Sequence, residues 1–64
     1  MKKCIVKRTD AKGDTYYFKE MLDYGAFQIP VFGKREDAFV FWSLTVARDF
    51  GHSYIGGSWE IERV

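Results

Sequence analysis

The chain has 64 residues, of which 47% are apolar and 19% aromatic, and this composition is typical of one folded domain rather than a disordered segment. Ten basic and nine acidic residues give a net charge of +1, far from the values of strong non-specific nucleic-acid binders or of DNA mimics. The single cysteine, Cys4, excludes an internal disulfide, and the longest apolar run, Ala38–Trp42, is far shorter than the ~20 residues that span a bilayer. We therefore expect one soluble domain in a reducing cytoplasm, with no membrane association.

The first third of the chain is predicted to form a β-hairpin over Met1–Met21. Its first strand, Lys3–Arg8, has the β-favouring Ile5 and Val6 among basic residues. Residues 9–14 are rich in turn formers, and Gly13 can adopt the left-handed backbone of a short hairpin loop. The second strand then runs over Thr15–Met21.

A third strand is predicted over Phe27–Phe32, after a break at residues 23–25. Large apolar side chains alternate there with Ala26, Gln28 and Pro30, which is the period-two pattern of a half-buried strand. Because proline cannot donate to a ladder, we expect this strand to lie at an edge of the sheet or to carry Pro30 at an unpaired position.

A helix is predicted from about Lys34 to Phe50, with Glu36 and Asp37 in its first turn and Gly51 at its end. On a helical wheel the inner, apolar arc contains Phe39, Trp42, Val46 and Phe50, with Val40, Leu44 and Ala47 beside them. Phe41 falls with the polar residues, as the one large apolar side chain of the outer face. We therefore expect Phe41 to be available for protein binding.

The last strand is predicted over Ser58–Val64, after a loop over His52–Ser58 that contains two adjacent glycines. Trp59 and Ile61 alternate with Glu60 and Glu62, so the two pairs occupy opposite faces. The expected fold is α+β, a small antiparallel or mixed sheet with one helix on one face in the order ββ(β)αβ. The right-handed crossover rule places the last strand parallel to an earlier one.

No residue pattern indicates catalysis or a cofactor, and we expect no enzyme. His52 is the only histidine, and a lone loop histidine is typical of a solvated side chain rather than a base. Cys4 is expected to be a small buried hydrophobe, and one cysteine with one histidine cannot supply a usual zinc set. Glu60 and Glu62 are expected to pair across strands with lysine or arginine, or to lie in water.

Nucleic-acid binding is the alternative that the residue chemistry supports most. Basic and aromatic side chains lie close together in the predicted hairpin, and such mixtures on a sheet can stack bases and hold phosphates. The residues concerned are Lys2, Lys3, Lys7, Arg8, Tyr16 and Tyr17. The small net charge supplies no electrostatic footprint for it.

The second half of the chain resembles a known family. Residues 27–33 (FQIPVFG), the helix start Glu36-Asp37-Ala38, Trp42 and residues 59–64 (WEIERV) are similar to the small inhibitor of bacterial RNA polymerase made by short-tailed coliphages. The resemblance implies a small sheet with one helix. It also implies binding to the β′ jaw in the DNA channel of the polymerase, which blocks promoter opening.

The resemblance assigns Arg63 to a family arginine of the last strand that takes part in polymerase contact. We expect Glu60, Glu62 and Phe41 to belong to the same partner-binding site. The expected function is a non-enzymatic, phage-encoded protein inhibitor in the cytoplasm of a host bacterium. Inhibition of another host or defence enzyme by the same surface is a further alternative, and the oligomeric state stays open.

Overall fold

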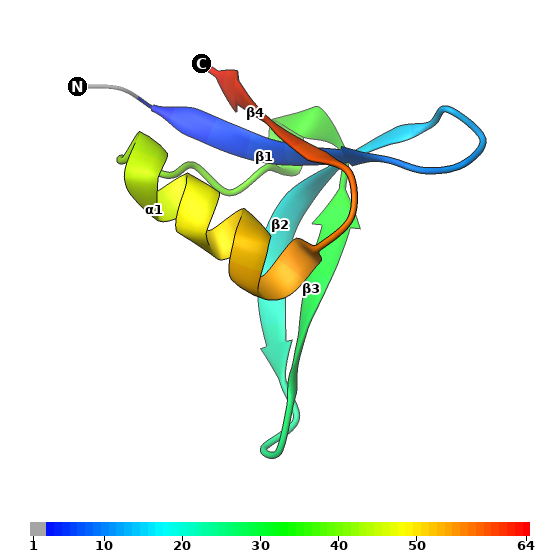
Figure 1. Cartoon of the computed structure of the whole chain (residues 1–64), viewed down its shortest axis with the longest axis vertical. Helices are drawn as coiled ribbons and strands as arrows, with labels where there is room; N and C mark the ends of the chain where they lie inside the picture. The colour runs from blue at the N-terminus through cyan, green and yellow to red at the C-terminus, as the bar shows by residue number, and fades with distance from the viewer. Residues whose placement is uncertain (1–2) are drawn as a thin grey trace.

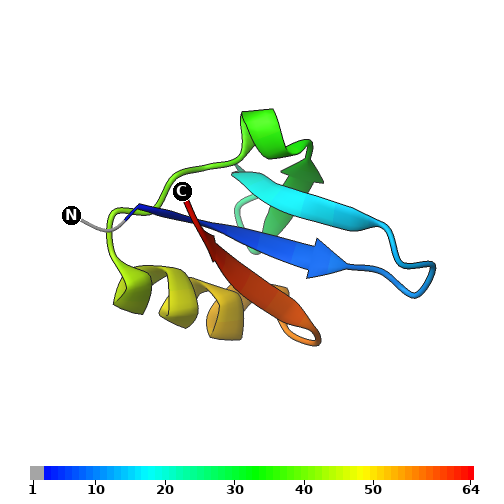
Figure 2. The ribbon, with the colours of Figure 1, turned by 90° about the horizontal axis from the view of Figure 1, so that it is seen from above.

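The computed structural model describes residues 3–64. It contains a single antiparallel sheet with one helical segment on one face (Figures 1 and 2). The strands are β1 (Cys4–Thr9), β2 (Thr15–Asp23), β3 (Gln28–Gly33) and β4 (Trp59–Arg63), in the order β3-β2-β1-β4 across the sheet. This confirms the predicted α+β fold and its ββ(β)αβ order. It also places β3, which contains Pro30, at an edge as predicted.

Both hairpin turns follow from local turn chemistry. In the β1–β2 turn the Asp10 carboxylate accepts hydrogen bonds from the backbone N–H groups of Lys12 and Asp14, and Gly13 has φ +91°. In the β2–β3 turn Asp23 accepts from the N–H of Gly25, which has φ +80°. Aspartate side chains commonly close turns in this way, and glycine supplies the left-handed backbone.

The last strand is antiparallel to β1, so the predicted parallel return is wrong. The pairs run from Cys4 opposite Arg63 to Arg8 opposite Trp59. The helical segment starts beside Cys4, whose thiol lies 3.9 Å from the Ser43 carbonyl oxygen, and reaches Trp59 at Gly51. It therefore runs in the direction of β1, and β4 must come back the opposite way. The right-handed crossover rule governs only parallel pairs.

A β-bulge in β2 separates half of the β2–β3 hairpin from the rest of the sheet. The β1–β2 pairs end at Lys7 opposite Tyr17, and the β2–β3 register shifts between Phe18 and Glu20. Bulges bend a strand and increase its twist. Beyond this point the hairpin, residues 20–31, projects from the molecule as an arm (Figure 1).

An extended segment, residues 38–42, fills the gap that opens between β1 and β2. The N–H of Phe39 donates to the carbonyl oxygen of Phe18 at 2.9 Å, and Phe41 exchanges two backbone hydrogen bonds with Cys4. These bonds satisfy backbone groups at the point where β2 leaves the side of β1.

The predicted continuous helix over Lys34–Phe50 is wrong in its first half. Only a 3-10 turn, η1 (Arg35–Asp37), forms near its start, and the α-helix α1 covers Leu44–Phe50. Ser43 is the N-cap, and its hydroxyl accepts from the N–H of Val46. At the other end, Gly51 does not stop the helix. The chain continues into a π-turn, η2 (Gly51–Ile55), and ends at Gly56 with φ +65°.

The core lies between the sheet and α1, with Cys4, Val6, Phe18, Phe41 and Ala47 buried. The Phe18 ring lies 4.3 Å from that of Phe50 and 6.0 Å from that of Phe41, measured between centroids. The expectation that Phe41 lies on an outer helix face is therefore wrong, because its backbone is extended and bridges to Cys4.

The same change of backbone moves predicted inner residues outward. Trp42 and Phe39 are 57% and 50% exposed, and Val46 is 56% exposed on the first turn of α1. Leu44, Ala47 and Phe50 of the predicted apolar arc do contact the core. The wheel drawn from Lys34 was thus correct for these three residues of α1, but wrong for Val46 and for the residues that are not helical.

Candidate functional site

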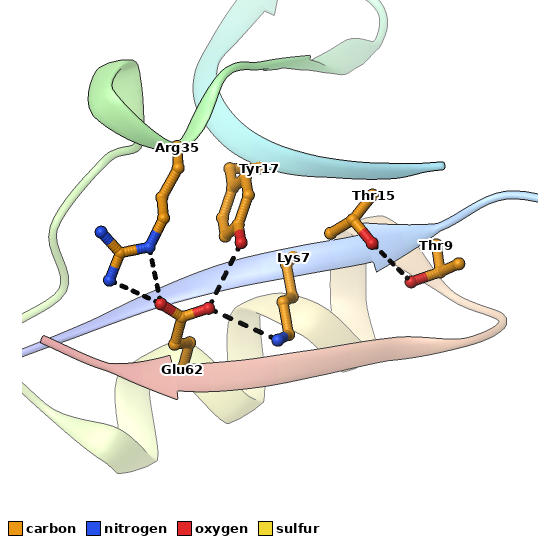
Figure 3. A network of polar contacts seen from close by, with 6 residues as sticks. All are labelled: Lys7, Thr9, Thr15, Tyr17, Arg35 and Glu62. Atoms are coloured by element: carbon orange, nitrogen blue, oxygen red, sulfur yellow. Dashed lines mark hydrogen bonds and ion pairs between the residues drawn. The ribbon is translucent and has the colours of Figure 1, made fainter. Parts of the chain in front are cut away.

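The open face of the sheet, opposite α1, has a polar network centred on Glu62 (Figure 3). One Glu62 oxygen accepts from Lys7 Nζ at 3.4 Å and from the Tyr17 hydroxyl at 3.3 Å. The other accepts from Arg35 Nε at 2.7 Å and lies 2.6 Å from Arg35 Nη2. Four side chains from β1, β2, η1 and β4 are joined in this way.

Electrostatics in this network favour the charged forms. The hydrogen bond from Arg35 holds the pKa of Glu62 below its ordinary value, aided by Lys7. The same hydrogen bond and the charge of Glu62 raise the pKa of Arg35. Both Arg35 nitrogens contact the same Glu62 oxygen, and hydrogen bonds between charged groups are shorter and stronger than those between neutral ones. The network therefore fixes η1 to the end of the sheet, which is a structural role.

The four residues predicted for partner binding do not form one surface. Phe41 is buried, and Glu62 is engaged by Arg35, Lys7 and Tyr17. The expected cross-strand pairing of a glutamate with lysine or arginine is thereby confirmed for Glu62. Glu60 is exposed on the open face, whereas Arg63 is exposed and lies opposite Cys4, on the face that α1 covers.

Arg63 belongs instead to a small exposed surface where the start of β1 meets the end of β4. We call Lys3, Trp42, Arg63 and Val64 the terminal surface. Lys3 Nζ lies 4.8 Å from the Trp42 ring centroid, and the N–H of Val64 donates to the Lys3 carbonyl oxygen at 3.1 Å. Cys4 pairs with Arg63 on one side and with Phe41 on the other. Lys3 and Trp42 are the chain neighbours of Cys4 and Phe41. Two cations and one exposed tryptophan thus lie at one end of the sheet, with Lys3 and Trp42 in contact and Arg63 on the side of α1.

The residues predicted to bind nucleic acid are divided between the two faces. Lys7 and Tyr17 pair with each other and contact Glu62 on the open face. Arg8 and Tyr16 pair on the opposite face, where Tyr16 is 45% exposed and Tyr17 is less exposed than Tyr16. Lys3 lies at the terminal surface, and Lys2 is outside the described residues. This distribution gives no single basic and aromatic patch on the hairpin.

The other residues considered for chemistry have packing contacts. Cys4 is 1% exposed, as expected for a buried hydrophobe. The exposed His52 packs its ring edge-on against Trp59, with centroids 5.2 Å apart. Within residues 3–64 there is no group of three metal-ligating side chains. The same residues contain no helix that is long and apolar enough to cross a membrane.

The arm is the main feature that the sequence pattern did not identify. Four of its large apolar side chains are exposed by 39% or more: Leu22, Tyr24, Phe27 and Ile29. A pocket of about 360 Å³, which we call the arm pocket, lies where the arm leaves the sheet. Four phenylalanine rings and Met21 line it, and the exposed Lys19 and Glu20 contribute to its mouth. The aromatic residues within positions 24–27 can be read from the sequence, but the exposure of their side chains depends on the β-bulge in β2.

No protein-family model, curated protein or solved structure matches the chain.

Proposed function

We propose that this chain is a non-enzymatic, phage-encoded inhibitor that binds a bacterial protein through the terminal surface, and that its target is RNA polymerase. The observation that supports binding is the exposed Trp42 in contact with Lys3, at the same end of the sheet as Arg63. The named target rests on the sequence resemblance alone.

Tryptophan and arginine are the residues that most often dominate the binding energy of protein interfaces. Trp42 is 57% exposed, so its ring is available to a partner. Lys3 adds positive charge beside its ring and Arg63 adds positive charge at the same end of the sheet, so the complementary patch on the partner is acidic. Such complementarity raises the association rate and fixes the orientation of the complex.

The proposed mechanism is steric. The molecule measures 34 × 28 × 21 Å, and a rigid body of this size can occupy a channel that DNA or a moving domain needs. The Glu62 network and the ladder between β1 and β4 hold the end of the sheet in place, so little ordering is required on binding. In the polymerase the site would be the β′ jaw, which the family occupies.

Two alternatives use other partners. In the first, the terminal surface inhibits a different host or defence enzyme through the same kind of contacts. A small nucleic-acid-binding regulator would instead depend on Arg8 and Tyr16 of the hairpin. That binding would weaken steeply with salt because counterions are released from the phosphates.

The test is a pull-down from nuclease-treated bacterial lysate with wild-type protein and two charge reversals. Arg63→Glu changes the terminal surface, and Lys12→Glu makes the same kind of change in the exposed β1–β2 turn as a matched control. We expect wild type and Lys12→Glu to retain the polymerase β and β′ subunits, and Arg63→Glu to lose them while its circular dichroism and melting temperature stay unchanged.

Each other result has a definite meaning. Undiminished binding by a folded Arg63→Glu protein would show that the assigned surface is wrong. Retention of one different enzyme would keep the inhibitor class and discard the polymerase. Recovery of partners only when nuclease is omitted, together with loss of these partners in the Arg8→Glu variant, would support the nucleic-acid-binding alternative instead.

A further inference from the structure

The β2 strand of the arm has a free edge beyond the bulge. Tyr24 donates its N–H to the carbonyl oxygen of Phe27 at 2.9 Å, so these two residues form a hydrogen-bonded pair. Pairs of an antiparallel ladder alternate between hydrogen-bonded and non-hydrogen-bonded, which places Asp23 and Met21 at non-hydrogen-bonded positions. Their backbone N–H and C=O groups therefore point away from β3. Pro30, opposite Met21, has no N–H to donate, which agrees with this assignment.

Within residues 3–64 no strand pairs with these outward groups. The pairs of β1 with β2 end at Tyr17, and the extended segment 38–42 reaches β2 only at Phe18, whose carbonyl oxygen accepts from the N–H of Phe39. Figure 1 shows the lower part of the arm projecting beyond both. A row of unpaired N–H and C=O groups is a template for another strand. On the other edge of the arm Pro30 removes one N–H, so the edge of β2 is the more complete template.

The arm pocket adjoins this free edge. β2 contributes residues 18–21 to its lining, the rest comes from Phe39, Phe41 and Phe50, and none of residues 28–33 of β3 lines it. The pocket therefore lies on the side of β2 that faces away from β3. It lies on the face of the arm where Met21 packs against the core.

An added strand would direct a side chain into the pocket. Side chains of paired residues lie on the same face, so the residue opposite Met21 points toward the pocket. An apolar cavity of ~150 Å³ is large enough to bind one benzene molecule. The arm pocket, at about 360 Å³, is more than twice as large, and its phenylalanine rings offer edge-to-face contacts to an aromatic side chain.

The charge along the free edge selects a basic residue beside the aromatic one. Asp23 lies on the same face as Met21, because the two are separated by one residue of the strand. Its Oδ1 closes the β2–β3 turn, whereas its Oδ2 has no hydrogen-bond partner within residues 3–64 and the side chain is exposed. Glu20 adds a second exposed carboxylate, and the basic Lys19 extends toward β3, with Cδ 3.5 Å from the position of a Cβ on Gly33. A lysine or arginine opposite Asp23 is therefore complementary.

We propose that the free edge of β2 binds an extended segment of another protein as an added antiparallel strand. A basic residue of that segment lies opposite Asp23 and, two positions later, an aromatic residue opposite Met21 enters the arm pocket. In this mode of recognition the main-chain hydrogen bonds supply affinity and the pocket supplies specificity. The basic residue comes first because antiparallel strands run in opposite directions. This inference does not rest on the proposed function, which uses the terminal surface.

The experiment is an NMR titration of the isotope-labelled full chain with a synthetic peptide. The probe is a capped hexapeptide of threonine with arginine at its third position and phenylalanine at its fifth. We expect saturable shifts of the amides of Met21 and Asp23, with a Kd on the order of 1 mM or below. Replacing the phenylalanine by alanine should raise the Kd by about tenfold, and replacing the arginine by glutamate should raise it by about threefold.

N-methylation of the peptide tests the backbone pairing with a matched control. In the proposed register the N–H of the phenylalanine points at β2, whereas the N–H of the threonine before it points away. A methyl group on the phenylalanine nitrogen should raise the Kd by about tenfold or more, because it removes a hydrogen bond and separates the strands. The same methyl group on the threonine nitrogen should leave the Kd unchanged.

Two protein variants test the pocket. Phe39→Ser removes an exposed ring of the pocket wall, and Phe27→Ser removes a similarly exposed ring from the opposite face of the arm. We expect weaker peptide binding only in Phe39→Ser, compared at a temperature at which thermal melts show both variants to be folded. The proposal is overturned if the wild type shows no binding at about 10 mM peptide. Equal effects of the two N-methylated peptides, or an equal loss in Phe27→Ser, also overturn it.

Discussion

Gly51 is a helical residue at which alanine is expected to destabilise the fold. Its backbone is right-handed helical, with φ −59° and ψ −44°, so an alanine there would gain ~1 kcal/mol of helix propensity. An added Cβ, however, would lie 2.5 Å from Cε2 and Cζ2 of the Trp59 ring and 2.6 Å from its Cη2. The two effects have opposite signs, and the structure decides which is larger.

The steric effect is the larger one. Carbon atoms in contact are ~3.5–4.0 Å apart, so the indole must move by about 1 Å to admit the methyl group. Such overpacking costs ~1–3 kcal/mol, and the propensity gain offsets ~1 kcal/mol of it. We expect a net loss of about 1 kcal/mol, which lowers Tm by ~4–8 °C in a domain of this size.

The assay is urea unfolding of wild type, Gly51→Ala, Trp59→Val and the double variant. With the indole removed, Gly51→Ala should become stabilising by ~1 kcal/mol, because only the propensity effect remains. The reasoning is refuted if Gly51→Ala stabilises the wild-type background, or if its effect is the same with and without the indole.

Three further substitutions test the core and the Glu62 network. Phe41→Ala should cost ~3–5 kcal/mol, close to the whole stability of a chain this short, whereas Trp42→Ala should cost well under half as much in the same thermal melts because Trp42 is exposed. Glu62→Gln should lower stability above pH 4.5, the ordinary pKa of the group, and the difference from wild type should vanish as the pH falls through the lowered pKa of the folded state. A difference that grows on acidification in pH-dependent urea titrations would contradict the assigned pKa direction.

The strands were predictable because their determinants are local. Residues 10–14 and 23–25 carry turn chemistry that needs no information from the rest of the chain, and the alternation of residues 59–62 fixes their faces. Trp59 and Ile61 contact the core, and Glu60 and Glu62 lie on the open face, as the period-two pattern predicts.

The helix was only half predictable because its start is set by distant contacts. Residues 39–42 fit a helical wheel, but they also have high β-propensity, and the backbone groups of Cys4 and Phe18 decide between the two. Ser43 was the local signal of the true start, as an N-cap three residues before Val46. The positions of Phe41 and Trp42 relative to solvent followed from this choice, so the predicted binding site changed with it.

Gly51 and the arm are two other features that could not be predicted from local sequence. Gly51 is a standard helix terminator by sequence, but the indole of Trp59, eight residues later, requires a residue without Cβ at that point. Exposure of Tyr24 and Phe27 depends on the register shift at Lys19, which has no distinctive local signal. Both features arise from the packing of elements against each other.

The bulge beside Phe18 also divides the molecule into two units of unequal cooperativity. The central strand β1 is paired on both sides, while the arm is held mainly by its own ladder and by the contacts of Met21. Amide hydrogens of β1 should therefore exchange only through global unfolding, and those of residues 21–30 through a sub-global opening that hinges at Lys19. A partner that binds the tip of the arm would therefore slow amide exchange in residues 21–30 before it affects β1, so exchange in the arm would measure binding at its tip.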